Sequence, residues 1–256
     1  MGNILLIARY TFLEMVRHKA LYAFVLFAFF LIGLGVAITQ MTIGDTVDII
    51  SDVGLGTTEL FLTGVTIFMG ISIIQKELSL RTLYPLLARP VSRSQYLLGK
   101  FFGMTFLTVV GLAFMALALW GMLAFYGGAA RMGGYLPALY TIFLQTLIVI
   151  AVAVFCSSFV EPAIGALVTV SFYIIGATSY SLAFLITKYT RETTKKVVTA
   201  LRYILPDFSH FNIKDNLVYG RGLEGIDLVQ ASLYAGAWII VVLSLSILLF
   251  NRKEIN

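Results

Sequence analysis

The chain has 256 residues, of which 59% are hydrophobic and only 12% are charged, and its mean hydropathy is +0.94. Soluble domains carry roughly 25% charged residues, so the composition excludes an ordinary water-soluble fold and predicts an all-α integral membrane protein in contact with membrane lipid. The net charge of +5 fits basic flanks beside membrane helices, and we therefore expect no nucleic-acid partner.

Residues 1–19 predict a helix that lies along the membrane surface before the first apolar run. Four apolar residues recur at helical spacing on one side: Leu5, Ala8, Phe12 and Met15. Glu14 can reach Arg17 within one turn, and such charges are foreign to the apolar core of a cleavable signal peptide. We expect an amphipathic interfacial helix. An ordinary basic flank that orients the first span stays an alternative.

Long runs of uncharged residues predict six membrane helices, since crossing the hydrocarbon core takes about 20 apolar residues. Their expected bounds are 20–44, 54–75, 98–130, 134–160, 162–187 and 228–251. The second run is the weakest, because it carries Glu59 and leaves only about 16 uncharged residues after it. We expect Glu59 to lie at the membrane interface, which keeps this run as a span.

The distribution of Lys and Arg predicts the orientation, because cytoplasmic segments of membrane proteins are enriched in both. An inside N-terminus places ten of the eighteen basic residues at the inner face, whereas the loop with Asp45, Asp48 and Asp52 holds none and belongs outside. Both termini are then cytoplasmic, and the chain is a multi-pass protein of the cell membrane. The segment 188–227 would be external although it carries seven basic residues, so an odd number of spans stays an alternative.

The segment 188–227 has an amphipathic pattern of its own. Residues 193–204 predict a short helix on the membrane surface, which ends at Leu205-Pro206-Asp207 because the residue before proline avoids the helical region. Phe208 and Phe211 would either anchor the segment in the interface or pack onto the spans.

Motifs of catalysis are absent. The sequence holds no Gly-x-x-x-x-Gly-Lys-Ser/Thr loop for a nucleotide, no Gly-x-Ser-x-Gly and no His-Glu-x-x-His. The single cysteine, Cys156, and the two histidines offer no metal-ligand spacing. Glu161 precedes Pro162 at a predicted turn, where a carboxylate is solvated. We expect no catalytic residue, cofactor or metal site on this chain.

A basic segment follows the second span and carries the most specific pattern. Residues 76–100 contain five basic residues and one acid, with Glu77 and Arg81 one helical turn apart, and the helix would break at Pro85 and Pro90. A loop that only retains positive charge inside is the plain alternative. The run resembles the signature between spans two and three of ABC-2 type transporter permeases: Glu77-x-x-x-Arg81-Thr82-Leu83, then Leu86-Leu87-Ala88-Arg89-Pro90-Val91-Ser92-Arg93 and Gly99-Lys100.

The resemblance covers nearly the whole chain. The interfacial N-terminal helix is similar to the family's elbow helix, and the basic tail from Phe250 to Glu254 is similar to the family's last residues. The stretch that begins at Leu205 resembles the Leu-Pro-rich segment before span six. Arg81 and Ser79 stand where the family usually has glycine and a second acid.

The resemblance implies a permease subunit of an ABC transporter, and we expect an exporter. A separate ATPase subunit in two copies would hold ATP and Mg, and a second permease chain, identical or a sibling, would complete the pathway. ATP-driven closure would reach this chain through the coupling segment 76–97. The implied contact residues are Glu77, Arg81, Thr82, Arg89, Pro90 and Arg93, with Glu14 and Arg17 of the elbow helix nearby.

Hydroxyl groups in the second and fifth spans are candidates for lining a pathway between two permeases: Thr63, Thr66, Ser72, Thr178, Ser179 and Ser181. Such hydroxyls often bond their own helix instead. Gly99 and Gly103 would let the third span pack closely against a neighbour. A membrane anchor or scaffold and a secondary transporter stay alternatives, and no residue pattern names the substrate.

Overall fold

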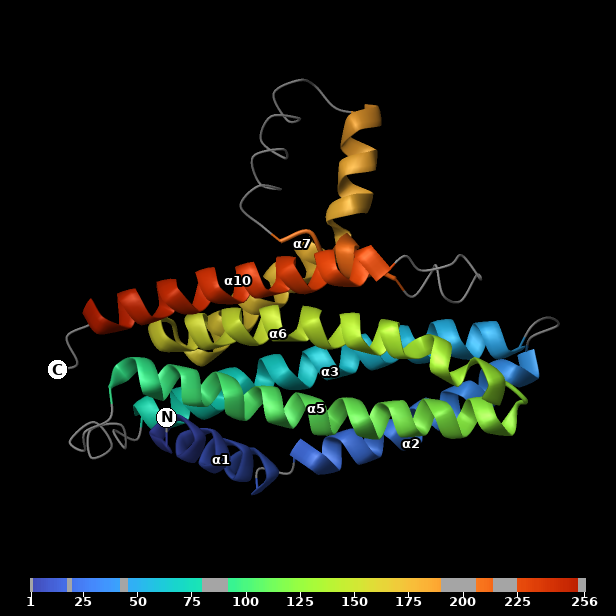
Figure 1. Cartoon of the computed structure of the whole chain (residues 1–256), viewed down its shortest axis with the longest axis horizontal. Helices are drawn as coiled ribbons and strands as arrows, with labels where there is room; N and C mark the ends of the chain where they lie inside the picture. The colour runs from blue at the N-terminus through green and yellow to red at the C-terminus, as the bar shows by residue number, and fades with distance from the viewer. Residues whose placement is uncertain are drawn as a thin grey trace.

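The computed structural model describes residues 2–17, 20–41, 46–79, 92–189, 206–213 and 225–252. These ranges are helical apart from short connections, and they contain no strand, which confirms the all-α prediction for this part of the chain. In chain order the helices are α1 (Gly2–Arg17), α2 (Ala20–Met41), α3 (Thr46–Ser79), α5 (Arg93–Phe125), the 3-10 turn η1 (Ala129–Tyr135), α6 (Leu136–Phe159), α7 (Pro162–Tyr189), η2 (Phe208–Phe211) and α10 (Gly225–Arg252). Figure 1 shows α2, α3, α5, α6 and α10 side by side in one bundle, whereas the last part of α7 extends away from it.

Five helices of the described ranges are long and apolar enough to cross a membrane. The qualifying spans are Leu21–Gln40, Thr46–Ser72, Arg93–Phe125, Arg131–Phe159 and Leu228–Phe250. Helix α7 adds the shorter apolar stretch Pro162–Thr178, so a count of six stays a prediction. The spans show a multi-pass membrane protein.

Helix α6 lies at the centre of the bundle. It packs against α3, α5, α7 and α10, and 78% of its apolar window is buried, against 17% for α2. A helix that is apolar on all sides is suited to such a core position. Among the described residues, α6 thus occupies the middle of the bundle.

The expected start of the second span at residue 54 is wrong, since α3 begins at Thr46. The polar residues that suggested a loop are accommodated in the first helical turns. Asp48 lies at the N-terminal end, where the helix dipole favours negative charge, and it pairs with Arg131. The Ser51 hydroxyl donates to the carbonyl of Val47 and to Tyr135 Oη. The span is therefore longer than predicted and shifts toward the N-terminus.

The two ends of the bundle differ in charge. One end, which we call the basic end, is formed by α1, the start of α5 and the last turn of α10, at the left of Figure 1. It carries Arg9, Arg17, Arg93 and Lys100. The turn at Glu161, between α6 and α7, is exposed and lies at this end, which confirms the predicted turn. The opposite end holds the Asp48–Arg131 pair.

The short segment 206–213 inserts between helices. Phe208 and Phe211 are buried in a cluster that includes residues of α3, α6 and α10, and Phe208 lies so close to Gly176 of α7 that a Cβ there would be 2.8 Å from its ring. The Asp207 amide donates to Tyr234 Oη at 2.8 Å. Of the two expectations for these phenylalanines, packing onto the spans is confirmed. The predicted helix 193–204 lies outside the described residues.

Candidate functional site

The start of α5 is fixed by a capping box. Ser92 Oγ accepts a hydrogen bond from the Gln95 amide at 3.3 Å, and Gln95 Oε1 accepts one from the Ser92 amide at 3.2 Å. This reciprocal pair satisfies two amide groups that the first turn leaves without helical partners. The capping box therefore fixes the start of α5 at Arg93, which is itself a predicted coupling residue.

Arg93 fastens this helix start to the end of α10. Its Nη1 donates to the Phe250 carbonyl at 2.8 Å, and its guanidinium carbon lies 5.8 Å from the centre of the Phe250 ring. The Tyr96 ring stacks on the same ring, with 6.4 Å between centroids. A cation is favoured here because the last carbonyls of a helix lack helical partners and carry partial negative charge.

Lys100, two turns further along α5, joins this helix to α1. Its Nζ lies 3.8 Å from Glu14 Oε2 and 5.7 Å from the centre of the Tyr96 ring. Only 2% of Lys100 is exposed. Burial of a charge is costly unless an opposite charge compensates it, so this pair makes the position of α1 depend on α5.

Two glycines bring the same helices into direct contact. A Cβ on Gly99 would lie 2.6 Å from Ile7 Cβ, and a Cβ on Gly103 would lie 2.8 Å from the Ala8 carbonyl oxygen. Any side chain at either position would push α1 away. The expected close packing at this glycine pair is confirmed, and the neighbour is α1.

The structure places only two of the eight predicted coupling residues, Glu14 and Arg93, together at the start of α5. Glu14 pairs with Lys100 of α5, and Arg93 is the first residue of that helix. Arg17 is exposed in the last turn of α1, and Glu77 belongs to the last turn of α3. The other four predicted residues lie outside the described ranges: Arg81, Thr82, Arg89 and Pro90. Their contact with an ATPase stays a prediction.

A second polar group lies at the middle of the bundle. Glu59 Oε1 accepts hydrogen bonds from Gln145 Nε2 of α6 at 2.9 Å and from Tyr173 Oη of α7 at 3.1 Å. Glu59 is the central residue of the span Thr46–Ser72, and Gln145 is the central residue of Arg131–Phe159. Glu59 is therefore central in its apolar stretch, because α3 starts earlier than predicted, and its expected place at the membrane interface stays a prediction.

This intramembrane group was missed by sequence reasoning, although one signal pointed to it. Glu59, Thr63 and Thr66 recur at positions i, i+4 and i+7, which places them on one face of a helix. An acid on the same face as two hydroxyls, inside an apolar helix, indicates a polar contact within the membrane. Nothing in the sequence identified Gln145 and Tyr173 as its partners.

The predicted pathway hydroxyls divide into two groups. Thr63 and Thr66 are buried inside the bundle, where Thr66 Oγ1 donates to the Leu62 carbonyl and Thr63 Oγ1 finds no hydrogen-bond partner within the described residues. Ser72 and Thr178 are exposed and donate to carbonyls of their own helices. The side chains of Ser179 and Ser181 lie outside the described ranges, so a pathway role stays a prediction.

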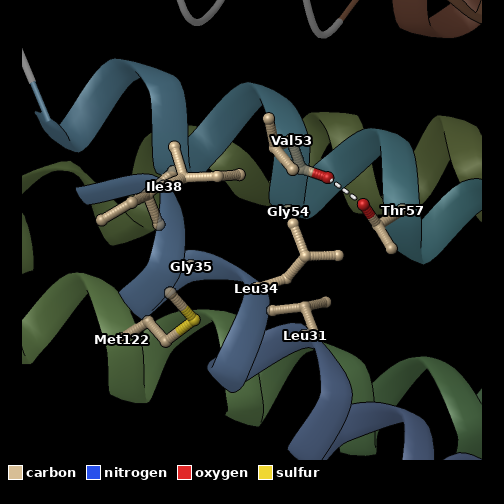
Figure 2. Close-up of a pocket in the computed structure, with 9 residues that line it drawn as sticks. Leu31, Leu34, Gly35, Ile38, Val53, Gly54, Thr57 and Met122 are labelled. Carbon is tan, nitrogen blue, oxygen red and sulfur yellow. Dashed lines mark hydrogen bonds between the residues drawn. The ribbon is translucent and has the colours of Figure 1, made fainter. Parts of the chain in front are cut away.

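One small cavity lies between α2, α3 and α5, as Figure 2 shows. Leu31, Gly35, Ile50 and Met122 are among its apolar lining residues, and Thr57 bonds the Val53 carbonyl instead of pointing a free hydroxyl into it. Its volume of about 10 Å³ holds at most one water molecule. It is a packing gap and not a substrate site.

Comparison with known proteins places the chain in a family. The family model described as ABC-2 family transporter protein matches residues 5–255, whereas a search of curated proteins gives no match. The match begins within α1 and spans all described spans and the segment 206–213. Proteins of this family are the transmembrane components of ABC transporters and not their catalytic subunits. The chain therefore belongs to the ABC-2 transporter family and is a membrane permease.

Proposed function

We propose that this chain is the permease subunit of an ABC exporter, driven by a separate ATPase subunit that is present in two copies and holds ATP and Mg. The observation that carries the proposal is the fastening of three helices around the start of α5, where the predicted coupling segment 76–97 ends. The family match over residues 5–255 supports the class of protein.

The fastenings convert a local push into a movement of several helices. A displacement of Ser92 would move α5, because the capping box makes this residue continuous with the helix. Arg93 would carry the end of α10, and Lys100 with the two glycines would carry α1. Coupling of this kind needs packed, rigid elements that connect the two sites, and the basic end supplies them.

Transport would take place between two permease chains. Because α6 occupies the middle of the bundle among the described residues, we place the route between two chains. Helix α2 presents much of its apolar surface outward, which suits contact with lipid or with a second chain, identical or a sibling. Thr178 and Ser72 are exposed hydroxyls that such a route could use.

The first test is site-specific cross-linking. A photoreactive amino acid at Arg89 should cross-link to a protein that contains a Walker nucleotide loop, whereas the same group at Arg131, at the opposite end of the bundle, should not. ATPase activity of the co-purified complex should fall when Glu77 or Arg81 is replaced by alanine.

Two outcomes would contradict the proposal. Equal cross-linking from both positions would mean that the coupling segment does not form a specific contact with the ATPase. The chain would then be better described as a membrane anchor. Unchanged nucleotide hydrolysis in both alanine variants would also contradict the assignment of the coupling residues. Transport that continues without ATP would favour a secondary transporter, the alternative to which the intramembrane Glu59 gives some weight.

A further inference from the structure

The Glu59 group occupies an unusual position for a charged side chain. Three helices contribute to it, and two of its residues are the central residues of their spans. Glu59 and Tyr173 are partly buried, while Gln145 is 4% exposed. Glu59 is thus only partly covered by this chain, at the centre of a stretch long enough to cross the membrane. An ionisable residue in such a position is a candidate functional site.

The hydrogen bonds hold the carboxylate in one orientation. Gln145 and Tyr173 both donate to the same oxygen, Oε1. The buried amide of Gln145 is itself held by the core helix α6, so this donor is fixed in place. A carboxylate fixed in this way in an apolar medium has a positively charged group as its natural ligand.

The surroundings select the kind of cation. The Tyr173 ring lies 6.2 Å from that of Phe208, and Phe172 lies 6.2 Å from Phe208 and 6.5 Å from Trp238. Aromatic rings attract large, weakly hydrated cations through their faces, whereas small metal ions require several oxygen ligands. Tyr173 joins the Glu59 carboxylate to this aromatic cluster, and an anion held by a member of such a cluster fits an organic cation with a hydrophobic body.

The polar face of α3 extends the site by one turn. Thr63 follows Glu59 by four residues on the same face and is 1% exposed, and its Oγ1 has no hydrogen-bond partner within the described residues. A buried hydroxyl in that state is unfavourable unless a ligand or water bonds it. Thr63 is the nearest additional polar group for a ligand held at Glu59.

We propose that Glu59, oriented by Gln145 and Tyr173, binds hydrophobic organic cations that enter from the lipid. This inference rests on the proposed function as a permease and names its substrate class: amphiphilic molecules with a protonated amine or another bulky cationic centre. The segment 206–213 packs Phe208 against the Tyr173 ring and so links the site to α10 through Tyr234.

The test measures binding to the full chain in lipid nanodiscs, without ATPase or nucleotide. Tetraphenylphosphonium is the cationic probe, and tetraphenylborate is an anion of the same shape and similar hydrophobicity. We expect saturable binding of the cation only. Glu59→Gln should weaken it by about tenfold or more, because the charge is lost while the side-chain shape is kept. Tyr173→Phe and Gln145→Leu should weaken it less.

Two controls separate binding from folding. Glu161→Gln removes an exposed acid at the α6–α7 turn and should leave binding unchanged. Glu59→Asp keeps the charge and should retain part of the affinity, and the thermal unfolding of every variant is measured in the same nanodiscs. If Glu59→Asp binds the cation and Glu59→Gln does not, while both unfold at similar temperatures, the loss of binding in Glu59→Gln is due to the lost charge and not to misfolding.

The proposal is overturned if both probes bind equally, since that is partitioning into lipid, or if Glu59→Gln binds the cation as the parent chain does. A site that responds to pH but not to the cation would be a proton site and would also overturn it. Because no ATPase is present, a negative result here leaves the proposed coupling function standing, and a failure of ATPase coupling leaves a positive binding result standing.

Discussion

Lys100 has a different role from the one that its place in a basic segment suggests. By composition it counts as one more positive residue at the inner face of the membrane. In the structure it is buried and paired with Glu14, and its ammonium group lies near the Tyr96 ring. The neighbouring Arg93 is likewise engaged by Phe250. These two cations therefore hold helices together within the chain.

The Glu14–Lys100 pair can be measured by a double-mutant cycle. Glu14→Gln should lower the thermal stability more than Lys100→Met does, because it leaves the buried Lys100 ammonium without its opposite charge, whereas Lys100→Met leaves only Glu14, which is partly exposed and can be solvated. The double variant should lose less than the two single losses combined, with a coupling energy of about 1 kcal/mol. Arg9→Gln, an exposed change in the same helix, serves as the control. Strictly additive losses would show that the pair does not stabilise the α1–α5 contact.

Helix α5 is the element through which the basic end is organised. It receives α1 at Gly99 and Gly103, and it receives α10 at Arg93 and Tyr96. The glycine pair was recognisable from its spacing, but its partner was not, because a pattern of small residues indicates close packing without naming the neighbouring helix. Only the tertiary structure identifies α1 as that neighbour.

Substitution of glycine within α5 should have opposite effects at two positions. Gly103→Ala should destabilise the chain by about 1–3 kcal/mol, because the added Cβ meets the Ala8 carbonyl oxygen and Thr11 Cβ, which cannot move aside without shifting α1. Gly121→Ala meets no atom within 4 Å and should be neutral or stabilise by up to about 1 kcal/mol through helix propensity. Thermal unfolding in nanodiscs measures both. Equal effects would mean that α1 does not pack as described.

For the whole molecule, the arrangement of charge predicts one orientation in the membrane. Arg9, Arg17, Arg93 and Lys100 gather at the basic end, whereas the opposite end has Asp48 paired with Arg131. Cytoplasmic enrichment of Lys and Arg therefore favours a cytoplasmic basic end. The start of α1 and the end of α10 lie at this end too, which agrees with the proposed cytoplasmic termini.

Accessibility of single cysteines checks the orientation. Cys156 is the chain's one cysteine and is buried, so Cys156→Ala gives a suitable background. A cysteine at Glu161 should react with a membrane-impermeant maleimide only after the cytoplasmic face is opened. A cysteine at the exposed Gly133 of η1 should react on intact cells. The reverse pattern would invert the proposed topology.

The sequence predicted the helical class and the spans better than it predicted the contacts between them. Uncharged runs located the apolar helices, because length and hydropathy alone decide membrane crossing. The start of α3 was misplaced because Asp48, Ser51 and Asp52 are typical of loops, and only their partners Arg131 and Tyr135 explain a helix there. The same error moved Glu59 away from the centre of its apolar stretch, so its site could not be predicted.

The central position of Glu59 also has a consequence for biosynthesis. An acidic side chain at the middle of a helix opposes its insertion from the translocon by about 3 kcal/mol. The span of α3 has the lowest mean hydropathy of the five, 1.3 against at least 2.2 for the others. Its hydrogen-bond donors, Gln145 and Tyr173, are synthesised only later. Helix α3 therefore gains these partners only after α6 and α7 have been synthesised, and we expect Gln145→Leu or Tyr173→Phe to lower the yield of correctly inserted chain.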